Sequence, residues 1–395
     1  MTAAGAHIAQ LIHREGPITF DRFMEAALYG EGGFFASGRG AGRAGGDFVT
    51  SPEVGPLFGA CVARALDRLW RALDEPDPFF VVEPGAGNGR LAREVLRAAP
   101  ACLPALRYVL VERSARLRAE QRERLAIEPA DEALGPFVRR AHEDQPIPAP
   151  AAGPVVTALE ELPPLAARGA VVLANELLDN LPFGVAEFDG RRWLEVRVAA
   201  RGDRFEEVLV PTDADLGLGY EVAPGTRVPI PRGIDDWWRA VEGVVQDGFV
   251  LVVDYATTLA ELGSRPWLRT YREHSAGTDP LDAPGEQDIT ADVVLEQVDA
   301  ASPFAHVRTD RQAEWLAALG IDDLVAEGRR VWEAGAARGD LEALAGRSRV
   351  TEAAALTAPD GLGAHRVLLF AAGSAAAGLD SPTAGFDWGP LDPAV

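Results

Sequence analysis

Residues 79–91 read Phe-Phe-Val-Val-Glu-Pro-Gly-Ala-Gly-Asn-Gly-Arg-Leu. An apolar run leads into Glu83, and glycines then follow at every second position, Gly85, Gly87 and Gly89. This order predicts a buried strand over 79–83, a tight turn, and a helix that begins near Arg90. Glycine suits such a turn because it adopts backbone conformations that other residues avoid, and because side chains there would block a bulky ligand. The stretch therefore predicts a strand–turn–helix unit with a ligand seated on the turn.

The pattern of alternating strands and helices continues beyond this unit. A second strand over 106–111 ends at Glu112 and precedes a charged helix over 114–125. Later strands are predicted over 171–174, 249–254, 305–309 and 366–371. Strands that alternate with helices predict an α/β fold with a doubly wound, Rossmann-like parallel sheet. Alternating apolar residues over 193–198 and 205–210 predict an inserted β-hairpin that turns at 201–203 and continues at 220–222.

We expect three regions along the chain. Residues 1–75 form an N-terminal helical region, and its glycine-rich loop 30–53 covers the cofactor. Its helices are predicted over 2–14, 20–28 and 54–73. Residues 76–373 form the core, with an insertion at about 190–245 and an acceptor-side loop of turns and short helices at about 256–300. Residues 374–395 show no apolar pattern and are predicted to be disordered.

The spacing of the glycine turn indicates the kind of cofactor. A nicotinamide site would read G-x-G-x-x-G, with a pyrophosphate on the helix N-terminus, whereas here the turn reads G-x-G-x-G. S-adenosylmethionine (SAM) has no phosphate but carries an ammonium group, which a carboxylate at Glu83 suits. Glu112, at the end of the next strand, can accept hydrogen bonds from both ribose hydroxyls. SAM, with S-adenosylhomocysteine as product, is the favoured cofactor. The alternatives are a nicotinamide cofactor or nucleotide, and a structural turn that binds no ligand.

The segment 174–183 is predicted to face the methyl acceptor, because ligands bind beyond the carboxyl ends of parallel strands. Asn175 offers an amide to the cofactor, and Glu176 and Asp179 are candidate catalytic carboxylates that a helical turn would place on one face. Such a pair can orient a guanidinium or take a proton from a nitrogen nucleophile. The alternative is that Asp179 caps a short helix and Glu176 is solvated. Tyr255 is a further catalytic candidate, or simply covers the end of its strand.

The composition of the chain limits the classes of molecule that it can bind. The chain of 395 residues carries 60 acidic and 38 basic residues, a net charge of −22, and contains no lysine. This charge opposes a nucleic-acid backbone and suits a basic or neutral acceptor, or it serves solubility alone. The cysteine and histidine spacings predict no metal site. The sequence also has no apolar run of membrane-spanning length and no targeting pattern, so no membrane association and a cytoplasmic location are expected.

Several motifs resemble those of the MidA-like methyltransferase family, which includes a mitochondrial complex I assembly factor that methylates an arginine of a complex I subunit. The likeness runs from about residue 16 to 371, and its most specific parts are D-F-V-T-S-P-E at 47–53 and N-E-L-L-D-N-L-P at 175–182. Further matches lie at the glycine turn, Val253-Asp254-Tyr255, 268–271 and 288–293. The loop at 180–183 is also similar to the N-P-P-Y/F loop of amino-group methyltransferases that act on bases or glutamine. The net charge disfavours a nucleic-acid acceptor.

The resemblance implies a class I SAM-dependent methyltransferase and a role for particular residues. Those that would cover or hold the cofactor are Thr50, Ser51, Pro52, Glu53, Glu83, Gly85, Gly87, Gly89, Glu112 and Asn175. Asp288 and Thr290 would shape the acceptor side. The expected acceptor is a nitrogen, or another nucleophile, of a protein or peptide, with arginine as a candidate. A small molecule or natural-product peptide as acceptor, a non-catalytic SAM-binding assembly factor, and a homodimer stay open.

Overall fold

The structure is a computed structural model that describes residues 2–37, 50–135, 152–212, 216, 222–262, 266–272, 275–338, 340–377 and 386–389. The chain divides into two compact units, each built from separate stretches of sequence. Unit 1 comprises Met1–Phe48, Leu177–Arg239 and Ala256–Ser302. Unit 2 comprises Val49–Glu176, Ala240–Tyr255 and Pro303–Val395.

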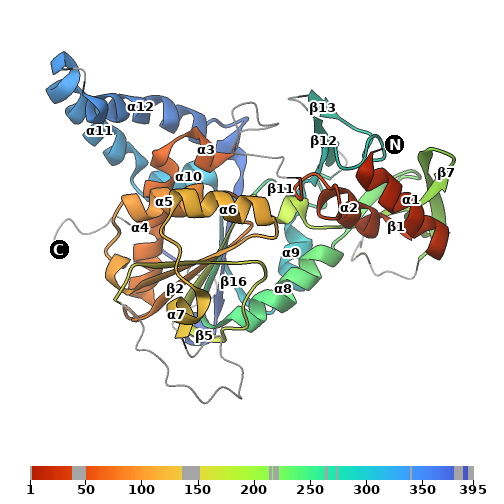
Figure 1. Ribbon diagram of the computed structural model, residues 1–395, viewed down its shortest axis with the longest axis horizontal. Helices are drawn as coiled ribbons and strands as arrows, with labels where there is room; N and C mark the ends of the chain where they lie inside the picture. The colour runs from red at the N-terminus through yellow and green to blue at the C-terminus, as the bar shows by residue number, and fades with distance from the viewer. Residues whose placement is uncertain are drawn as a thin grey trace. The chain divides into compact units, whose positions relative to one another are not determined.

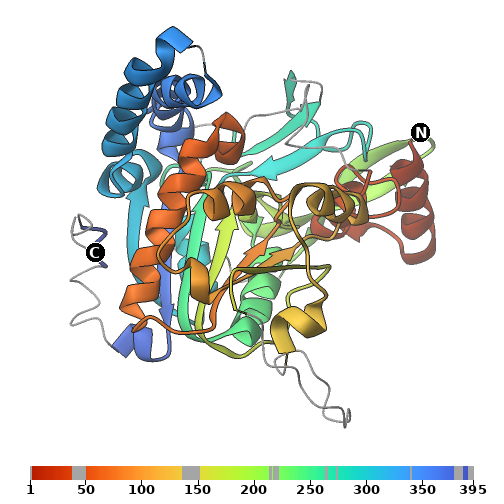
Figure 2. The same cartoon turned by 60° about the vertical axis from the view of Figure 1, so that its left-hand side comes forward.

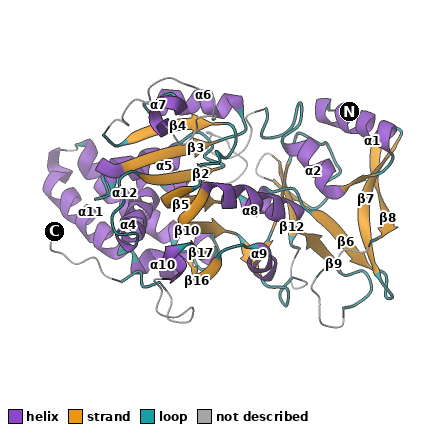
Figure 3. Ribbon diagram, turned by 90° about the horizontal axis from the view of Figure 1, so that it is seen from below, coloured by secondary structure: helices purple, strands orange, loops and turns teal. Residues whose placement is uncertain are grey.

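Unit 2 contains a seven-stranded sheet in the order β4-β3-β2-β5-β10-β17-β16, seen in Figure 3. Its strands are β2 (Phe79–Pro84), β3 (Leu106–Val111), β4 (Val155–Leu159), β5 (Ala167–Asn175), β10 (Val245–Asp254), β16 (Ala305–Arg311) and β17 (Arg366–Ala372). The strands from β4 to β10 run parallel, whereas β17 lies antiparallel between β10 and β16. The predicted doubly wound α/β sheet is confirmed, and β4 is the strand that the sequence pattern did not reveal.

Helices pack against this sheet and share a hydrophobic cluster with one of its faces. They are α3 (Ser51–Val54), α4 (Pro56–Ala72), α5 (Arg90–Arg97), α6 (Ala115–Arg124), α7 (Ala130–Leu134), α10 (Gln312–Ala318), α11 (Ile321–Gly335), α12 (Leu341–Leu356) and α13 (Ser374–Ala377), with short 3-10 turns at Leu103–Ala105, Ala336–Arg338 and Leu362–Ala364. Residues of α4, α5 and α10 join the buried faces of β2, β3, β5 and β10 in one hydrophobic cluster. Figure 1 shows α4 and α5 over the sheet, and α11 and α12 form the blue helix pair in Figure 2.

Unit 1 contains a second, antiparallel sheet together with helices and shorter strands. Its elements are α1 (Ala3–Glu15), β1 (Ile18–Thr19), α2 (Phe20–Leu28), a 3-10 turn (Leu178–Asn180), β6 (Gly184–Phe188), β7 (Trp193–Arg201), β8 (Arg204–Pro211), β9 (Arg227–Ile230), β11 (Ala256–Thr257), β12 (Leu268–Arg272), β13 (Ser275–Gly277), β14 (Asp288–Ala291), β15 (Val293–Val294) and α9 (Leu295–Ala301). The predicted hairpin is confirmed as β7–β8, although residues 220 and 221 of its expected continuation lie outside the described residues. Helix α8 (Arg232–Val244) continues from unit 1 into unit 2 along the chain.

The division of the chain differs from the expected one. Strand β1 pairs with β7, and α1 and α2 share a hydrophobic cluster with β6 and β7, so the N-terminal segment belongs with the inserted sheet. Helix α4, which was expected in the same N-terminal region, instead packs in the core of unit 2. Buried apolar contacts over long sequence separations therefore decide the division.

Two expectations of irregular structure are corrected. Within 256–300, β12 pairs with both β13 and β14 to form a small sheet, where we expected only turns and short helices. Its polar residues Asp288 and Thr290 are buried, so the apolar alternation that marks a strand is missing. Beyond Gly373, expected to be disordered, Ser374–Ala377 forms α13, and Phe386 and Trp388 are buried in the core of unit 2. Two aromatic side chains supplied enough burial to order their short segment.

Candidate active site

The glycine turn joins β2 to α5 at the carboxyl edge of the sheet in unit 2. Gly85, Gly87 and Gly89 have φ angles of 70°, 54° and 77°, in the left-handed region that glycine tolerates best. A Cβ added at Gly87 would meet no atom within 4 Å among the described residues. The backbone is thus left-handed where the sequence predicted it, and the space above Gly87 is open to a ligand.

Glu112 follows β3 and holds the turn from one side. Its Oε2 accepts a hydrogen bond from the Gly87 backbone N–H at 3.0 Å, and its Oε1 accepts one from the Ser114 N–H at 2.8 Å. Burial raises the pKa of Glu112, and these two backbone donors oppose the rise. Each carboxylate oxygen has two lone pairs, so Glu112 can still accept hydrogen bonds from a ligand such as a ribose diol.

Glu83 ends the apolar part of β2 and is almost fully buried, at 4% exposed. Its Oε2 accepts a hydrogen bond from the Tyr108 hydroxyl at 2.7 Å. Burial raises the pKa of Glu83 to about 8, since the ionised form loses its hydration. A cationic group beside Glu83 would favour the ionised form, as expected for a carboxylate that meets an ammonium.

The segment 50–53 contacts the end of β5. The Ser51 N–H donates to Glu176 Oε1 at 2.9 Å. Thr50 and Glu53 cap the N-terminus of α3, because the Thr50 N–H donates to Glu53 Oε2 at 3.1 Å. Pro52 lies in the first turn of this helix, where a backbone N–H is not needed. The neighbouring Gly46 to Val49 of the same motif lie outside the described residues.

Asn175 is the last residue of β5, and Glu176 follows it. Glu176 has a left-handed φ of 50°, which is unfavourable for a non-glycine residue. The Asn175 amide Nδ2 donates to Glu176 Oε1 at 3.4 Å, while its buried Oδ1 has no hydrogen-bond partner among the described residues. A buried acceptor without a donor is costly, so this oxygen is suited to a donor from a bound cofactor.

Tyr255 follows β10 and lies against a histidine that the sequence did not single out. The ring centroids of Tyr255 and His365 are 3.9 Å apart. His365 is 2% exposed, its two ring nitrogens have no hydrogen-bond partner among the described residues, and burial lowers its pKa to about 4. His365 is therefore neutral near pH 7 and lies beside the predicted Tyr255.

Gln312 is a second residue that sequence reasoning missed. Its Oε1 accepts a hydrogen bond from the Ser51 hydroxyl at 3.1 Å, and its Nε2 donates to the Leu356 carbonyl at 3.0 Å. Its backbone N–H donates to the His365 carbonyl at 2.8 Å. Gln312 thereby joins the segment that contacts Glu176 to the segment that contacts Tyr255. A lone glutamine at the start of a helix carries no sequence signal for such a role.

Asp179 lies in unit 1, in the short 3-10 turn after β5. It is 6% exposed, and its Oδ2 accepts a hydrogen bond from the Thr290 hydroxyl at 2.8 Å. Burial raises the pKa of Asp179 to about 6, and the Thr290 hydrogen bond opposes the rise. Its other oxygen, Oδ1, has no hydrogen-bond partner among the described residues.

Asn180 and Asp288 form the neighbouring contact in unit 1. The Asn180 amide Nδ2 donates to Asp288 Oδ1 at 3.0 Å and to the Ile289 carbonyl at 3.2 Å. Both amide hydrogens are therefore used inside the protein, which leaves none to read a nucleobase. Strand β14 thus holds the turn that carries Asp179.

The predicted helical pairing of Glu176 and Asp179 is wrong. Glu176 lies before the 3-10 turn with a left-handed backbone, and only Asp179 belongs to that turn. The division between the two compact units also falls between Glu176 and Leu177. The spacing of three residues therefore does not place both carboxylates on one helical face.

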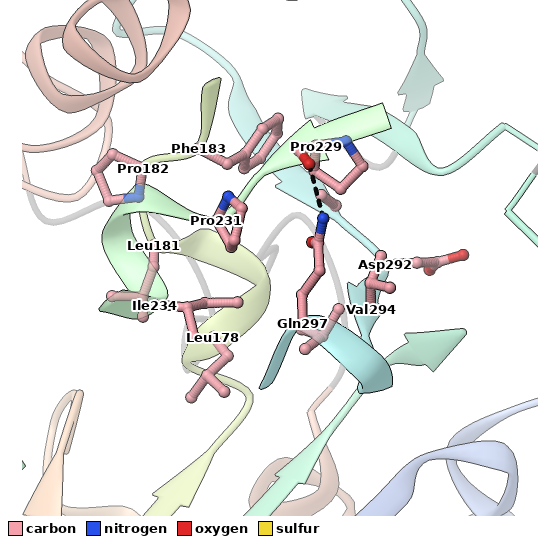
Figure 4. A pocket seen from close by; sticks show the side chains of 12 residues that line it. Leu178, Leu181, Pro182, Phe183, Pro229, Pro231, Ile234, Asp292, Val294 and Gln297 are labelled. Atoms are coloured by element: carbon pink, nitrogen blue, oxygen red, sulfur yellow. Dashed lines mark hydrogen bonds between the residues drawn. The ribbon is translucent and has the colours of Figure 1, made fainter. Parts of the chain in front are cut away.

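A small, mainly apolar cavity of about 20 Å³ lies in unit 1, beside the 3-10 turn Leu178–Asn180 (Figure 4). It is lined by Leu178, Leu181, Pro182, Phe183, Pro229, Pro231, Ile234, Ala291, Asp292, Val293, Val294 and Gln297. The Gln297 amide donates to the Pro229 carbonyl at 2.9 Å within this group (Figure 4). Such a volume holds about one water molecule, so this cavity is too small for a cofactor or an acceptor.

Among the described residues, no group of three or more histidine, cysteine, aspartate or glutamate side chains is placed to hold a metal ion. Among the helices of the described ranges, none is long and apolar enough to cross a membrane.

The sheet order, with its last strand inserted antiparallel, and the glycine turn between Glu83 and Glu112 define a class I SAM-dependent methyltransferase. The chain belongs to the family described as "Putative S-adenosyl-L-methionine-dependent methyltransferase", whose family model matches residues 61–309. It is similar, at 27% identity and a TM-score of 0.75, to a Burkholderia thailandensis protein whose crystal structure contains S-adenosyl-homocysteine. That similarity covers 98% of this chain and 94% of the other. The predicted fold, cofactor and enzyme class are confirmed.

Curated relatives are named as protein arginine methyltransferases. The Drosophila melanogaster NDUFAF7 homolog is 28% identical over 72% of this chain, and the matched part spans 66% of that relative. Human NDUFAF7 is 26% identical, with 80% of this chain and 73% of the relative covered. Both relatives are named as mitochondrial. The expected cytoplasmic location is therefore corrected by this comparison.

Proposed function

We propose that this methyltransferase transfers a methyl group to a nitrogen of a protein or peptide, and that this nitrogen belongs to an arginine guanidinium. The observation that carries the proposal is Asp179, a buried carboxylate with one oxygen held by Thr290 and the other without a partner among the described residues. A guanidinium N–H is a strong donor for such an oxygen. The net charge of −22 and the names of the curated relatives support a basic protein acceptor.

In this proposal the residues of the glycine turn hold the cofactor. Glu112 accepts hydrogen bonds from the ribose hydroxyls, and Glu83 pairs with the ammonium group. The left-handed glycines at 85, 87 and 89 keep side chains out of the space above the turn. Thr50, Ser51, Pro52 and Glu53 cover the cofactor, and Asn175 Oδ1 accepts a hydrogen bond from it. When bound, SAM supplies a methyl group on a cationic sulfonium, which is already a strong electrophile.

The acceptor-side residues then position the nucleophile. Asp179, whose pKa is about 6, is ionised near pH 7. It orients the guanidinium and accepts the proton that the nitrogen loses on methylation. Glu176, held by the Ser51 N–H, contributes a second carboxylate. Tyr255, which lies against His365, lines the acceptor side. Positioning and exclusion of water are the main tasks left to the protein.

The proposal is tested by labelling the acceptor. The purified chain and its Asp179→Asn variant are each incubated with methyl-labelled SAM and lysate of the source cell, and labelled species are identified by mass spectrometry. We expect label on arginine of one or a few proteins with the wild-type chain and none with the variant. Label confined to small molecules would contradict a protein acceptor. Label on another residue type would contradict arginine.

A further inference from the structure

The two peptide groups that meet at Gly87 are each held by a side chain. Its N–H donates to Glu112 Oε2 at 3.0 Å, and its carbonyl accepts a hydrogen bond from Gln121 Nε2 at 2.7 Å. Glycine has the most freely rotating backbone of all residues. The backbone conformation of Gly87 therefore depends on Glu112, which holds its N–H, and on Gln121, which holds its carbonyl.

Gln121 has an unusual position in α6. This helix, which the structure describes in full, is rich in charged residues, and Gln121 is its one buried residue, with an exposed fraction of 0%. Its Cγ lies 3.3 Å from the position that a Cβ on Gly89 would take, so the side chain also lies directly against the end of the turn. The amide is thus buried between α6 and the cofactor turn.

Only half of the Gln121 amide has a partner. Its Nε2 donates to the Gly87 carbonyl, whereas its buried Oε1 has no hydrogen-bond partner among the described residues. An unpaired buried oxygen costs free energy, so an apolar side chain of similar volume would fill the same space at little cost in stability. A simple filling role does not account for an amide at this position.

We propose, on the basis of the cofactor site proposed above, that Gln121 is a positioning residue for SAM, acting through the Gly87 backbone on Glu112. Glu112 Oε2 depends on the Gly87 N–H for its orientation, and Gly87 keeps the left-handed conformation that aims this N–H while both of its peptide groups are held. Loss of the Gln121 donor removes one of these two restraints from a glycine backbone that otherwise rotates freely. The Glu112 carboxylate then loses the geometry in which its remaining lone pairs meet the ribose hydroxyls.

The test measures cofactor binding, so it does not depend on the identity of the methyl acceptor. S-adenosylhomocysteine and adenosine are titrated calorimetrically into wild type and Gln121→Met, and thermal melting is recorded for both proteins. Met has nearly the volume of Gln but no donor. We expect both ligands to bind the variant roughly tenfold more weakly, with a melting temperature within about 3 °C of wild type. Equal losses for the two ligands would locate the effect in the adenosine part, which carries the ribose.

Gln297→Met is the matched control, because the Gln297 amide also donates to one backbone carbonyl, that of Pro229, in the other unit. We expect this control to keep wild-type affinity for both ligands. If Gln121→Met does not fold, Gln121→Leu is the second variant, because its side chain also lacks a donor and carries no charge. Affinity within about twofold of wild type in the folded Gln121 variant would overturn the proposal. A wild-type chain that binds neither ligand would contradict the cofactor site itself, a result distinct from failure of the Gln121 role.

Discussion

The Ser51 backbone N–H donates to Glu176 Oε1 at 2.9 Å, across 125 residues of sequence. The Ser51 hydroxyl, in turn, donates to Gln312 Oε1 at 3.1 Å. Glu176 has a left-handed backbone, a conformation that costs a non-glycine residue about 1 kcal/mol. The segment that the sequence predicted to cover the cofactor thus also fixes a candidate catalytic carboxylate.

Glu176→Gln tests whether the charge of this carboxylate matters. The amide keeps the Oε1 acceptor for the Ser51 N–H, so we expect an unchanged melting temperature and S-adenosylhomocysteine affinity. Methyl transfer to the labelled acceptor is expected to fall by roughly 100-fold, the usual effect of losing a positioned charged group. Glu314→Gln is the control, since Glu314 also accepts one backbone N–H, from Arg311 at 3.1 Å. Wild-type turnover in Glu176→Gln would remove Glu176 from the mechanism.

The raised pKa of Asp179 predicts that methyl transfer decreases on the acid side of its pH profile. Its pKa is raised to about 6 by burial, so the required carboxylate is lost as the pH falls through about 6. We expect kcat/KM to rise between about pH 5 and 7. Thr290→Val removes the hydrogen bond that lowers this pKa and should shift the midpoint to higher pH, whereas Thr290→Ser should not. Identical midpoints in the two variants would show that the decrease belongs to another group.

The raised pKa of Glu83 predicts that a proton is released when the cofactor binds. Burial raises its pKa to about 8, so the free protein carries a protonated Glu83 at pH 7, and a bound ammonium favours the carboxylate. Calorimetry of SAM binding in two buffers of different ionisation enthalpy should show proton release at pH 7, smaller release at pH 9, and none in Glu83→Gln. Buffer-independent heats in wild type would contradict this assignment.

The same pKa has a consequence for stability. The folded pKa of Glu83 lies above its usual value of 4.5, so its stabilising contribution is complete below about pH 4.5 and is lost as the pH rises through about 8. Glu83→Gln should therefore show a smaller decrease in unfolding free energy between these pH values, measured by denaturant titration. An identical decrease in both proteins would argue that Glu83 is not buried as described.

Gly87→Ala and Gly202→Ala form a matched pair of variants. Both glycines are left-handed, with φ of 54° and 65°, and a Cβ on either would meet no atom within 4 Å among the described residues. Each substitution should cost about 1 kcal/mol of stability through backbone strain. Only the Cβ at Gly87 enters the cofactor space, so only Gly87→Ala should weaken S-adenosylhomocysteine binding, by at least about tenfold. Equal affinities in the two variants would mean that the cofactor does not lie over Gly87.

The sequence predicted the parts of the fold that depend on local pattern. The strand before Glu83, the left-handed glycines and the β7–β8 hairpin follow from apolar periodicity and turn chemistry. The small sheet around β12 was missed because buried Asp288 and Thr290 interrupt its apolar pattern. The predicted roles of the site residues, and the homodimer, stay predictions.

Residues that act through distant partners left no sequence signal. Gln121 contacts Gly87 across 34 residues, and Gln312 contacts Ser51 across 261. Neither spacing matches a local rule, because only the folded sheet brings these segments together. The predicted pairing of Glu176 and Asp179 failed for a local reason. Glu176 itself has a left-handed backbone, so no regular helix connects the two residues.

The most direct test is a calorimetric titration of S-adenosylhomocysteine into wild type, Glu112→Gln and Glu160→Gln. Glu112 and Glu160 follow neighbouring parallel strands, β3 and β4, but only Glu112 contacts the glycine turn. We predict one binding site per chain in wild type and in Glu160→Gln, and affinity weaker by at least about tenfold in Glu112→Gln, which loses the charge of the carboxylate proposed to face the ribose. Equal affinity in all three proteins would contradict a cofactor site at the glycine turn.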